Sequence, residues 1–160
     1  MSKRSVLAVI VVAMVGTLLP LGGSASAVRI GNEGCTPGYW KNHTDDWEEA
    51  SPDQTLASLG WTFGSENAAY ADLTMLEALS AGGGTGIDGA TRILVRAATA
   101  AWLNAAHEGV GYPYRRFATG LNGRAPLIDL INDALTSGSR RAMIRLANTL
   151  DNANNLGCEL

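Results

Sequence analysis

The sequence predicts an all-α protein: a compact bundle of about five helices that begins with an irregular N-terminal aromatic segment and is closed by one disulfide. Three observations favour this fold class. Apolar residues recur at helical spacing through the second half of the chain. No segment after residue 27 alternates between apolar and polar residues over the length of a strand. Two cysteines stand near opposite ends of this same region, whose length suits one domain with one core.

Residues 1–27 have the pattern of a secretory signal peptide. Lys3 and Arg4 precede an almost uninterrupted apolar run, and Ala25-Ser26-Ala27 forms a small-residue cleavage site. A membrane anchor is the weaker interpretation, because the run is shorter than the roughly 18 residues that a spanning helix needs. We therefore expect cleavage after Ala27, a single secreted helical domain over residues 28–160, and no stable membrane insertion of that domain.

The charge balance of this domain is acidic. The signal segment contains two positive charges and no negative ones, so its removal moves the formal net charge from −3 to −5. Binding of nucleic acid or of an anionic membrane needs clustered Lys and Arg, and we expect neither partner. Arg140, Arg141 and Arg145 do cluster, but three charges on one helical face are more typical of a solvated surface.

Cys35 and Cys158 are the two cysteines of the chain, and in an exported protein they are expected to form a disulfide. Closing such a long loop would destabilise the unfolded chain by about 5 kcal/mol on the chain-entropy argument. A metal site that uses both thiolates is the alternative. It is disfavoured because the chain has no Cys-x-x-Cys pair and only His43 and His107 as histidines. We predict no metal site and no cofactor.

The sequence from Gly34 to His43, GCTPGYWKNH, combines residue types that are uncommon together. Thr36 to Tyr39 fit a type II turn, since Pro37 and Gly38 would occupy its two central positions. We therefore expect a turn there, followed by a short helix.

Aromatic rings at three- and four-residue spacing follow this turn, which would place them along one side of that short helix. We favour packing in the core, because large aromatic residues are mostly buried. The alternative is an exposed stacking platform for a surface glycan or a protein partner, and a glycine-flanked loop further along the chain could add another ring to it. The candidate binding residues are Tyr39, Trp40, His43, Trp47 and Trp61.

A run of carboxylates, Asp45, Asp46 and Glu48, follows His43. These groups could bind a metal or act in acid–base chemistry, but one histidine beside carboxylates does not define a site. The glycine-rich residues 82–86 lack the Gly-Lys-Ser/Thr sequence and the preceding strand of a phosphate-binding loop, and we interpret them as a flexible link. We predict no catalytic residue. A secreted hydrolase or carbohydrate-processing enzyme that uses His43 and these carboxylates is the alternative function.

Two helices are expected in the middle of the chain. Asp72 is the expected cap of a helix that ends near residue 81. Asp88 is the expected cap of the longest helix, from residue 89 or 90 to about residue 107. The alanine-rich middle of that helix lets neighbouring helices approach closely, so we predict that it is the central buried helix. Asn104 and His107 are polar residues near this core, and we expect them to form structural hydrogen bonds.

The C-terminal third predicts a helical hairpin. Apolar residues from Leu127 to Leu135 follow the helical spacing rule, with Pro126 suited to the first turn. Ser137-Gly138-Ser139 would end this helix and cap the next one, over about residues 140–154. That last helix should fold back antiparallel to its predecessor.

The opening motif resembles the signature of a known class of proteins. Cys35 to His43, read with Trp47, the Leu-rich residues 72–79, Tyr112-Pro113 and the terminal Leu-Asp-x-x-Asn-Asn-x-Gly-Cys, is similar to an uncharacterised class of exported bacterial and archaeal proteins that carry the CTPGYWKNH signature. The resemblance covers essentially all of residues 28–160. It implies a secreted or cell-surface helical domain and brings no activity or catalytic residue with it. We therefore expect an interaction or structural role outside the cell.

Overall fold

The computed structural model describes residues 31–160; the expected signal peptide, residues 1–27, lies outside the described residues. Over residues 31–160 the chain forms five α-helices, several single 3₁₀ turns and no β-strand, with two isolated β-bridges. The all-α prediction is confirmed. The helices are α1 (Pro37–Asn42), α2 (Met75–Leu79), α3 (Gly86–Ala106), α4 (Leu127–Thr136) and α5 (Arg140–Asn154).

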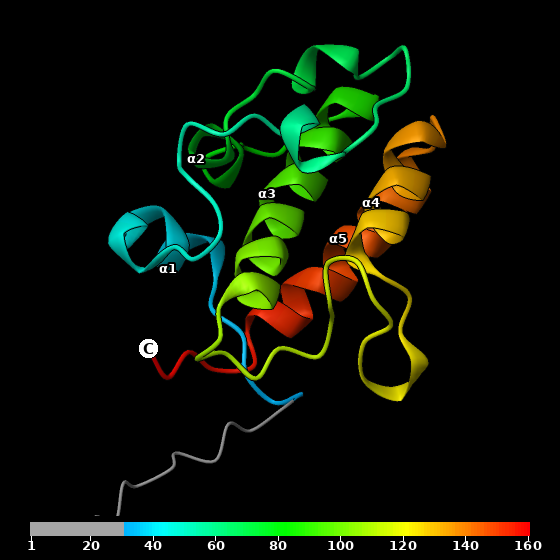
Figure 1. The fold of residues 1–160 in the computed structure, drawn as a ribbon. Coiled ribbons are helices and arrows are strands. Elements are labelled where there is room, and N and C mark those ends of the chain that lie inside the picture. The colour runs from blue at the N-terminus through cyan, green and yellow to red at the C-terminus, as the bar shows by residue number, and fades with distance from the viewer. Residues whose placement is uncertain (1–30) are drawn as a thin grey trace, which may run out of the picture.

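The long helix α3 runs through the middle of the molecule, as the alanine-rich sequence predicts. Figure 1 shows α1 and α2 on one side of α3, and α4 and α5 on the other. Every residue from Ala97 to Asn104 is buried, because small side chains let neighbouring helices approach on all sides. The most extensive packing of α3 is against α5.

The start of α3 differs from the prediction. Thr85 precedes the first helical residue, and Asp88 lies within the first turn, so the prediction of Asp88 as the cap is wrong. Gly86 belongs to the helix, so the prediction of a flexible link over residues 82–86 is wrong at its end. Asp88 still has a favourable position, since a carboxylate near a helix N-terminus interacts well with the helix dipole.

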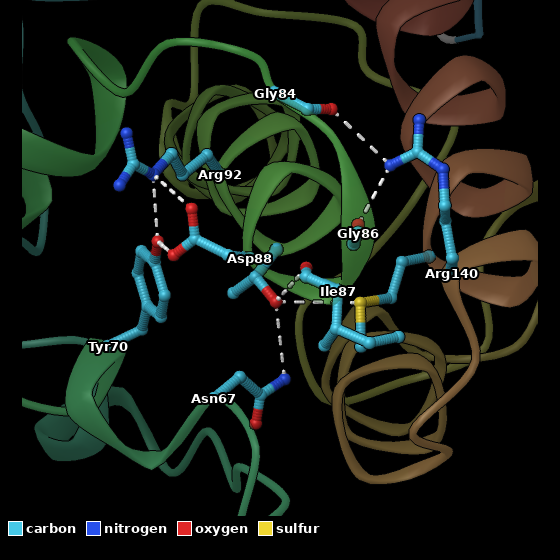
Figure 2. Close-up of polar contacts among 10 residues, drawn as sticks. Asn67, Tyr70, Gly84, Gly86, Ile87, Asp88, Arg92 and Arg140 are labelled. Carbon is cyan, nitrogen blue, oxygen red and sulfur yellow. Dashed lines mark hydrogen bonds and ion pairs between the residues drawn. The ribbon is translucent and has the colours of Figure 1, made fainter.

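This first turn of α3 is attached to its surroundings on two sides. The Arg140 side chain, at the start of α5, donates a hydrogen bond to the carbonyl oxygen of Gly86 at 2.9 Å (Figure 2). Asp88 pairs with Arg92 at 3.1 Å and accepts a hydrogen bond from the Tyr70 hydroxyl. These contacts connect α3 to α5 and to the loop before α2.

The N-terminus of α2 also differs from the prediction, because Thr74 and not Asp72 is the cap. The Thr74 hydroxyl oxygen accepts a hydrogen bond from the Glu77 backbone N–H at 3.3 Å. The Glu77 carboxylate accepts one from the Thr74 N–H at 2.9 Å. This reciprocal capping box satisfies two backbone donors that the helix leaves free.

The expected type II turn at the start of the motif is wrong as well. Thr36 caps α1 by accepting a hydrogen bond from the Tyr39 N–H at 3.2 Å, and Pro37 occupies the first turn of this helix. Gly38 does not adopt the positive φ that a type II turn requires. Because α1 ends at Asn42, Trp47 does not lie on the same helix as Tyr39.

The predicted C-terminal hairpin is present. α4 and α5 pack against each other, and three residues connect them. Gly138 adopts a left-handed φ of 59°, and the Ser139 hydroxyl oxygen accepts a hydrogen bond from the Ala142 N–H at 3.3 Å. The turn therefore ends one helix and caps the next, as the sequence indicates.

Candidate functional site

The opening motif meets the C-terminus of the chain. Cys35 and Cys158 form a disulfide with their Cα atoms 4.6 Å apart, as predicted. Beside it, the Gly34 N–H donates a hydrogen bond to the Gly157 carbonyl oxygen at 2.8 Å. A disulfide of this kind persists in an oxidising compartment.

A buried side-chain amide in α3 forms hydrogen bonds to the segment around this disulfide. The Asn104 side-chain oxygen accepts hydrogen bonds from the Cys35 N–H at 2.7 Å and from the Trp40 indole N–H at 3.1 Å. Its side-chain nitrogen donates to the Cys35 carbonyl oxygen at 2.9 Å and to Asn154 at 3.0 Å. All four hydrogen-bonding positions of the Asn104 amide are therefore used, which is the structural role predicted for it.

Asn154 in α5 extends this network. Its side-chain oxygen also accepts a hydrogen bond from the Tyr112 hydroxyl at 2.7 Å, and its nitrogen donates to the Ala97 carbonyl oxygen at 2.9 Å. Burial raises the pKa of Tyr112 well above its ordinary value, so the phenol stays protonated and can donate. The network joins α3, α5 and the segment that follows α3.

Two of the candidate binding residues lie in the core. Trp40 is fully buried and Trp61 is 3% exposed. The Trp61 ring packs edge-on against Trp102, with 5.8 Å between centroids. Trp47 is half-buried, and its indole N–H donates to the Trp40 carbonyl oxygen at 2.9 Å. For these three rings the structure favours packing over an exposed platform.

Tyr39 and His43 lie nearer the surface and stack on each other, with ring centroids 4.3 Å apart and planes 9° apart. The His43 Nδ1 atom lies 2.9 Å from the Tyr39 carbonyl oxygen. The Tyr39 hydroxyl donates to Asp46 at 2.6 Å. Burial, followed by the Asp46 carboxylate, raises the pKa of Tyr39 to about 12, so this phenol is a neutral donor near pH 7.

The carboxylates near His43 do not converge on it. Asp46 accepts the Tyr39 hydrogen bond, and Asp45 is exposed. Glu48 points to a different element, where it accepts the Glu108 backbone N–H at 2.7 Å and lies 3.5 Å from His107. In the described part of the chain, no three His, Cys, Asp or Glu residues are grouped to hold a metal ion. The geometry that the hydrolase alternative requires is therefore not formed by these residues.

A groove of about 460 Å³ lies between α4, α5 and the segment before α4, and it is not among the sites that the sequence predicts. Its lining is mostly apolar, and one arginine is contributed by the segment before α4 and another by α5. The Arg124 guanidinium lies over the Tyr114 ring, 5.3 Å from its centroid. The lining residues are Tyr114, Arg124, Ala125, Leu130, Asp133, Ala134, Ala142, Arg145, Leu146 and Thr149.

Part of the signal for this groove was present in the sequence. Helical spacing places Leu130 and Leu146 on the inner faces of their helices, and in the structure both are only half-buried. Arg145 is exposed, as expected for a solvated face, and its side chain also borders the groove. Periodicity gives the direction of a side chain along a helix, but it does not show where the space between two helices stays open.

Comparisons with protein-family models, with curated proteins and with solved structures find no match to this chain. Within residues 31–160, no helix is both long enough and apolar enough to cross a membrane. The chemistry offered by the groove is non-covalent: apolar contact along its walls, two guanidinium groups that can bind carboxylates, and one carboxylate of its own, Asp133.

Proposed function

We propose that this chain is an exported helical domain, secreted or held at the cell surface, that binds a protein partner through the groove between α4 and α5. The observation that carries the proposal is the apolar lining of this groove beside Arg124 and Arg145. Export is supported by the signal-like sequence of residues 1–27 and by the disulfide.

The lining indicates the chemistry of the partner. The half-buried side chains of Leu130 and Leu146 favour contact with apolar side chains. Arginine presents a planar fork of donors that fits a carboxylate. A peptide segment with an apolar residue next to Asp or Glu satisfies both features.

A protein segment fits this groove better than a glycan does. Sugar rings stack on exposed aromatic faces, but Tyr114, the aromatic residue of the lining, is 6% exposed and lies beneath the Arg124 guanidinium. Most of the remaining lining surface is aliphatic, and the hydrogen-bonding side chains that sugar hydroxyls need are the smaller part of it.

A peptide-display screen with the oxidised protein tests this function. We expect it to select peptides that combine apolar and acidic residues. Arg145→Glu should weaken their binding by about tenfold or more, because it removes one charge-assisted contact. Arg141→Glu is the matched control: it makes the same charge change on the same helix, outside the groove lining, and should leave affinity within about twofold.

Two results would oppose the groove function. One is a screen that selects no peptide above background. The other is a set of selected peptides whose affinity falls equally in both variants, which would assign the effect to overall charge. The domain would then be left with a structural role.

A further inference from the structure

A small cavity of about 70 Å³ lies beside the C-terminal end of α4, and it is partly open to solvent because several of its lining residues, Ser65, Glu66, Thr136 and Gly138, are exposed. The loop of residues 64–67, the first turn of α3 and the turn between α4 and α5 line it. None of its lining residues belongs to the α4/α5 groove. An inference about this cavity therefore does not depend on the proposed partner binding.

The cavity contains a buried oxygen without a donor. Asn67 is 2% exposed, and its side-chain oxygen has no hydrogen-bond partner in the structure. The amide orientation is fixed, because its nitrogen donates to the Leu135 carbonyl oxygen at 3.0 Å, and a carbonyl can only accept. Figure 2 shows the Asn67 nitrogen on the side of α3 and the oxygen turned away from it. A buried acceptor without a partner costs about 1–3 kcal/mol, so this oxygen should have a ligand.

Other oxygens face the same space. A Cβ atom placed on Gly64 would lie 3.7 Å from the Asn67 side-chain oxygen and 3.7 Å from the Thr136 carbonyl oxygen. Thr136 is the last residue of α4, where carbonyls have no intrahelical donor. The Leu135 carbonyl oxygen is 3.4 Å from the same point, but it already accepts from Asn67 and from the Gly64 N–H.

A carboxylate adds negative charge at this end of the helix. A Glu66 carboxylate oxygen lies 3.5 Å from the position of a Cβ on Gly138, in the turn that follows α4. Glu66 also lines the cavity, and among residues 31–160 it forms no ion pair. The C-terminus of a helix carries partial negative charge, so the surroundings favour a cation.

We propose that this cavity is a calcium site, in which the Asn67 side-chain oxygen, the Thr136 carbonyl oxygen and the Glu66 carboxylate are the protein ligands. Ca²⁺ binds carboxylate, amide and carbonyl oxygens together with water, which is the donor set present here. A site with one carboxylate has low charge and belongs with the weak extracellular calcium sites, for which Kd is about 0.1–1 mM.

A buried water molecule is the competing occupant. It could donate hydrogen bonds to Asn67 and Thr136, and the cavity is large enough for one. A water can donate a hydrogen bond to the Glu66 carboxylate or equally to the neutral amide of a glutamine, whereas a Ca²⁺ ion requires the negative charge. The two occupants therefore predict different consequences when this carboxylate is neutralised.

Isothermal titration of CaCl₂ into the oxidised, chelator-treated full chain tests the proposal. We expect one Ca²⁺ per chain, with Kd of about 0.1–1 mM. Glu66→Gln should weaken binding at least about tenfold, because it removes the charged ligand. The matched control Asp72→Asn neutralises an exposed carboxylate outside the cavity lining and should leave Kd unchanged.

Gly64→Ala provides a second variant, because its new Cβ would occupy the space that the oxygens face. Gly64 does not have a left-handed φ, and the new contacts of 3.4–3.7 Å are ordinary ones, so the variant should fold. Its Tm in chelator should match that of the wild-type chain, and CaCl₂ should no longer raise it. Absence of Ca²⁺ binding by the wild-type chain, or equal binding by the wild-type and Glu66→Gln chains, would overturn the proposal in favour of water.

Discussion

The side-chain amide of Asn104, in α3, holds groups from two other parts of the chain: the opening motif and α5. It pairs with both backbone groups of Cys35, with the Trp40 indole and with Asn154. Because all of these partners are buried, none can turn to water if the amide is lost. The position therefore contributes to stability mainly through the cost of leaving its partners unpaired.

Replacing this amide should be costly. Asn104→Leu removes the partner of three buried groups in the opening motif, so we expect the free energy of unfolding to fall by about 3–5 kcal/mol. Urea unfolding followed by tryptophan fluorescence measures this loss. Asn148→Leu changes an exposed asparagine of α5 and should cost no more than about 0.5 kcal/mol. A loss below about 1 kcal/mol for Asn104→Leu would contradict the role assigned to the network.

The sequence indicates the role of Asn104 but not its partners. A polar residue in an alanine-rich helix is expected to form hydrogen bonds, since an unpaired buried amide is unfavourable. The partners lie 69 and 50 residues away, at Cys35 and Asn154. No local sequence pattern connects positions so far apart, so the network depends on how α3, α5 and the opening motif pack together.

At the scale of the elements, the start of α3 depends on a close approach between two glycines. A Cβ on Gly89 would lie 2.0 Å from the Gly84 carbonyl carbon and 2.2 Å from its oxygen. Both are backbone atoms and cannot rotate away. The glycine-rich segment therefore packs directly on the first turn of α3.

This packing predicts a strong difference between two glycine substitutions. Gly89→Ala should lower the free energy of unfolding by about 3 kcal/mol, the upper end of the usual cost of overpacking. Gly82→Ala is the matched control, because no atom lies within 4 Å of its new Cβ, and its φ is not left-handed. It should be neutral or stabilising by up to about 1 kcal/mol. Equal thermal stability of the two variants would show that the glycine contact is not close in solution.

Helix existence could be predicted better than helix boundaries. The five helices follow from apolar spacing, alanine content and the Ser-Gly-Ser turn. Asp72 and Asp88 were predicted as caps because Asp is a common cap residue. The predictions were wrong because a nearby threonine, Thr74 or Thr85, is the cap in each case. One signal was readable: Thr74 and Glu77 have the spacing of a capping box.

At the scale of the whole molecule, the chain has no local sequence signature for either proposed site. The groove arises where α4, α5 and the preceding segment leave apolar side chains partly uncovered. The proposed calcium ligands come from a loop and from the end of a helix that is 69 residues further along, measured from Asn67 to Thr136. Such sites depend on how the elements pack, which periodicity and residue type do not determine.

The joined ends of the domain are the central feature of this account, and the free energy of unfolding tests their contribution most directly. The disulfide spans a sequence separation of 123 residues, and closing a loop of that length should stabilise the fold by about 5 kcal/mol. Urea unfolding at 25 °C of the oxidised wild-type chain and of a Cys35→Ala/Cys158→Ala variant should therefore differ by several kcal/mol. A variant as stable as the wild-type chain would contradict the account, because the two ends would then be held together without the bond.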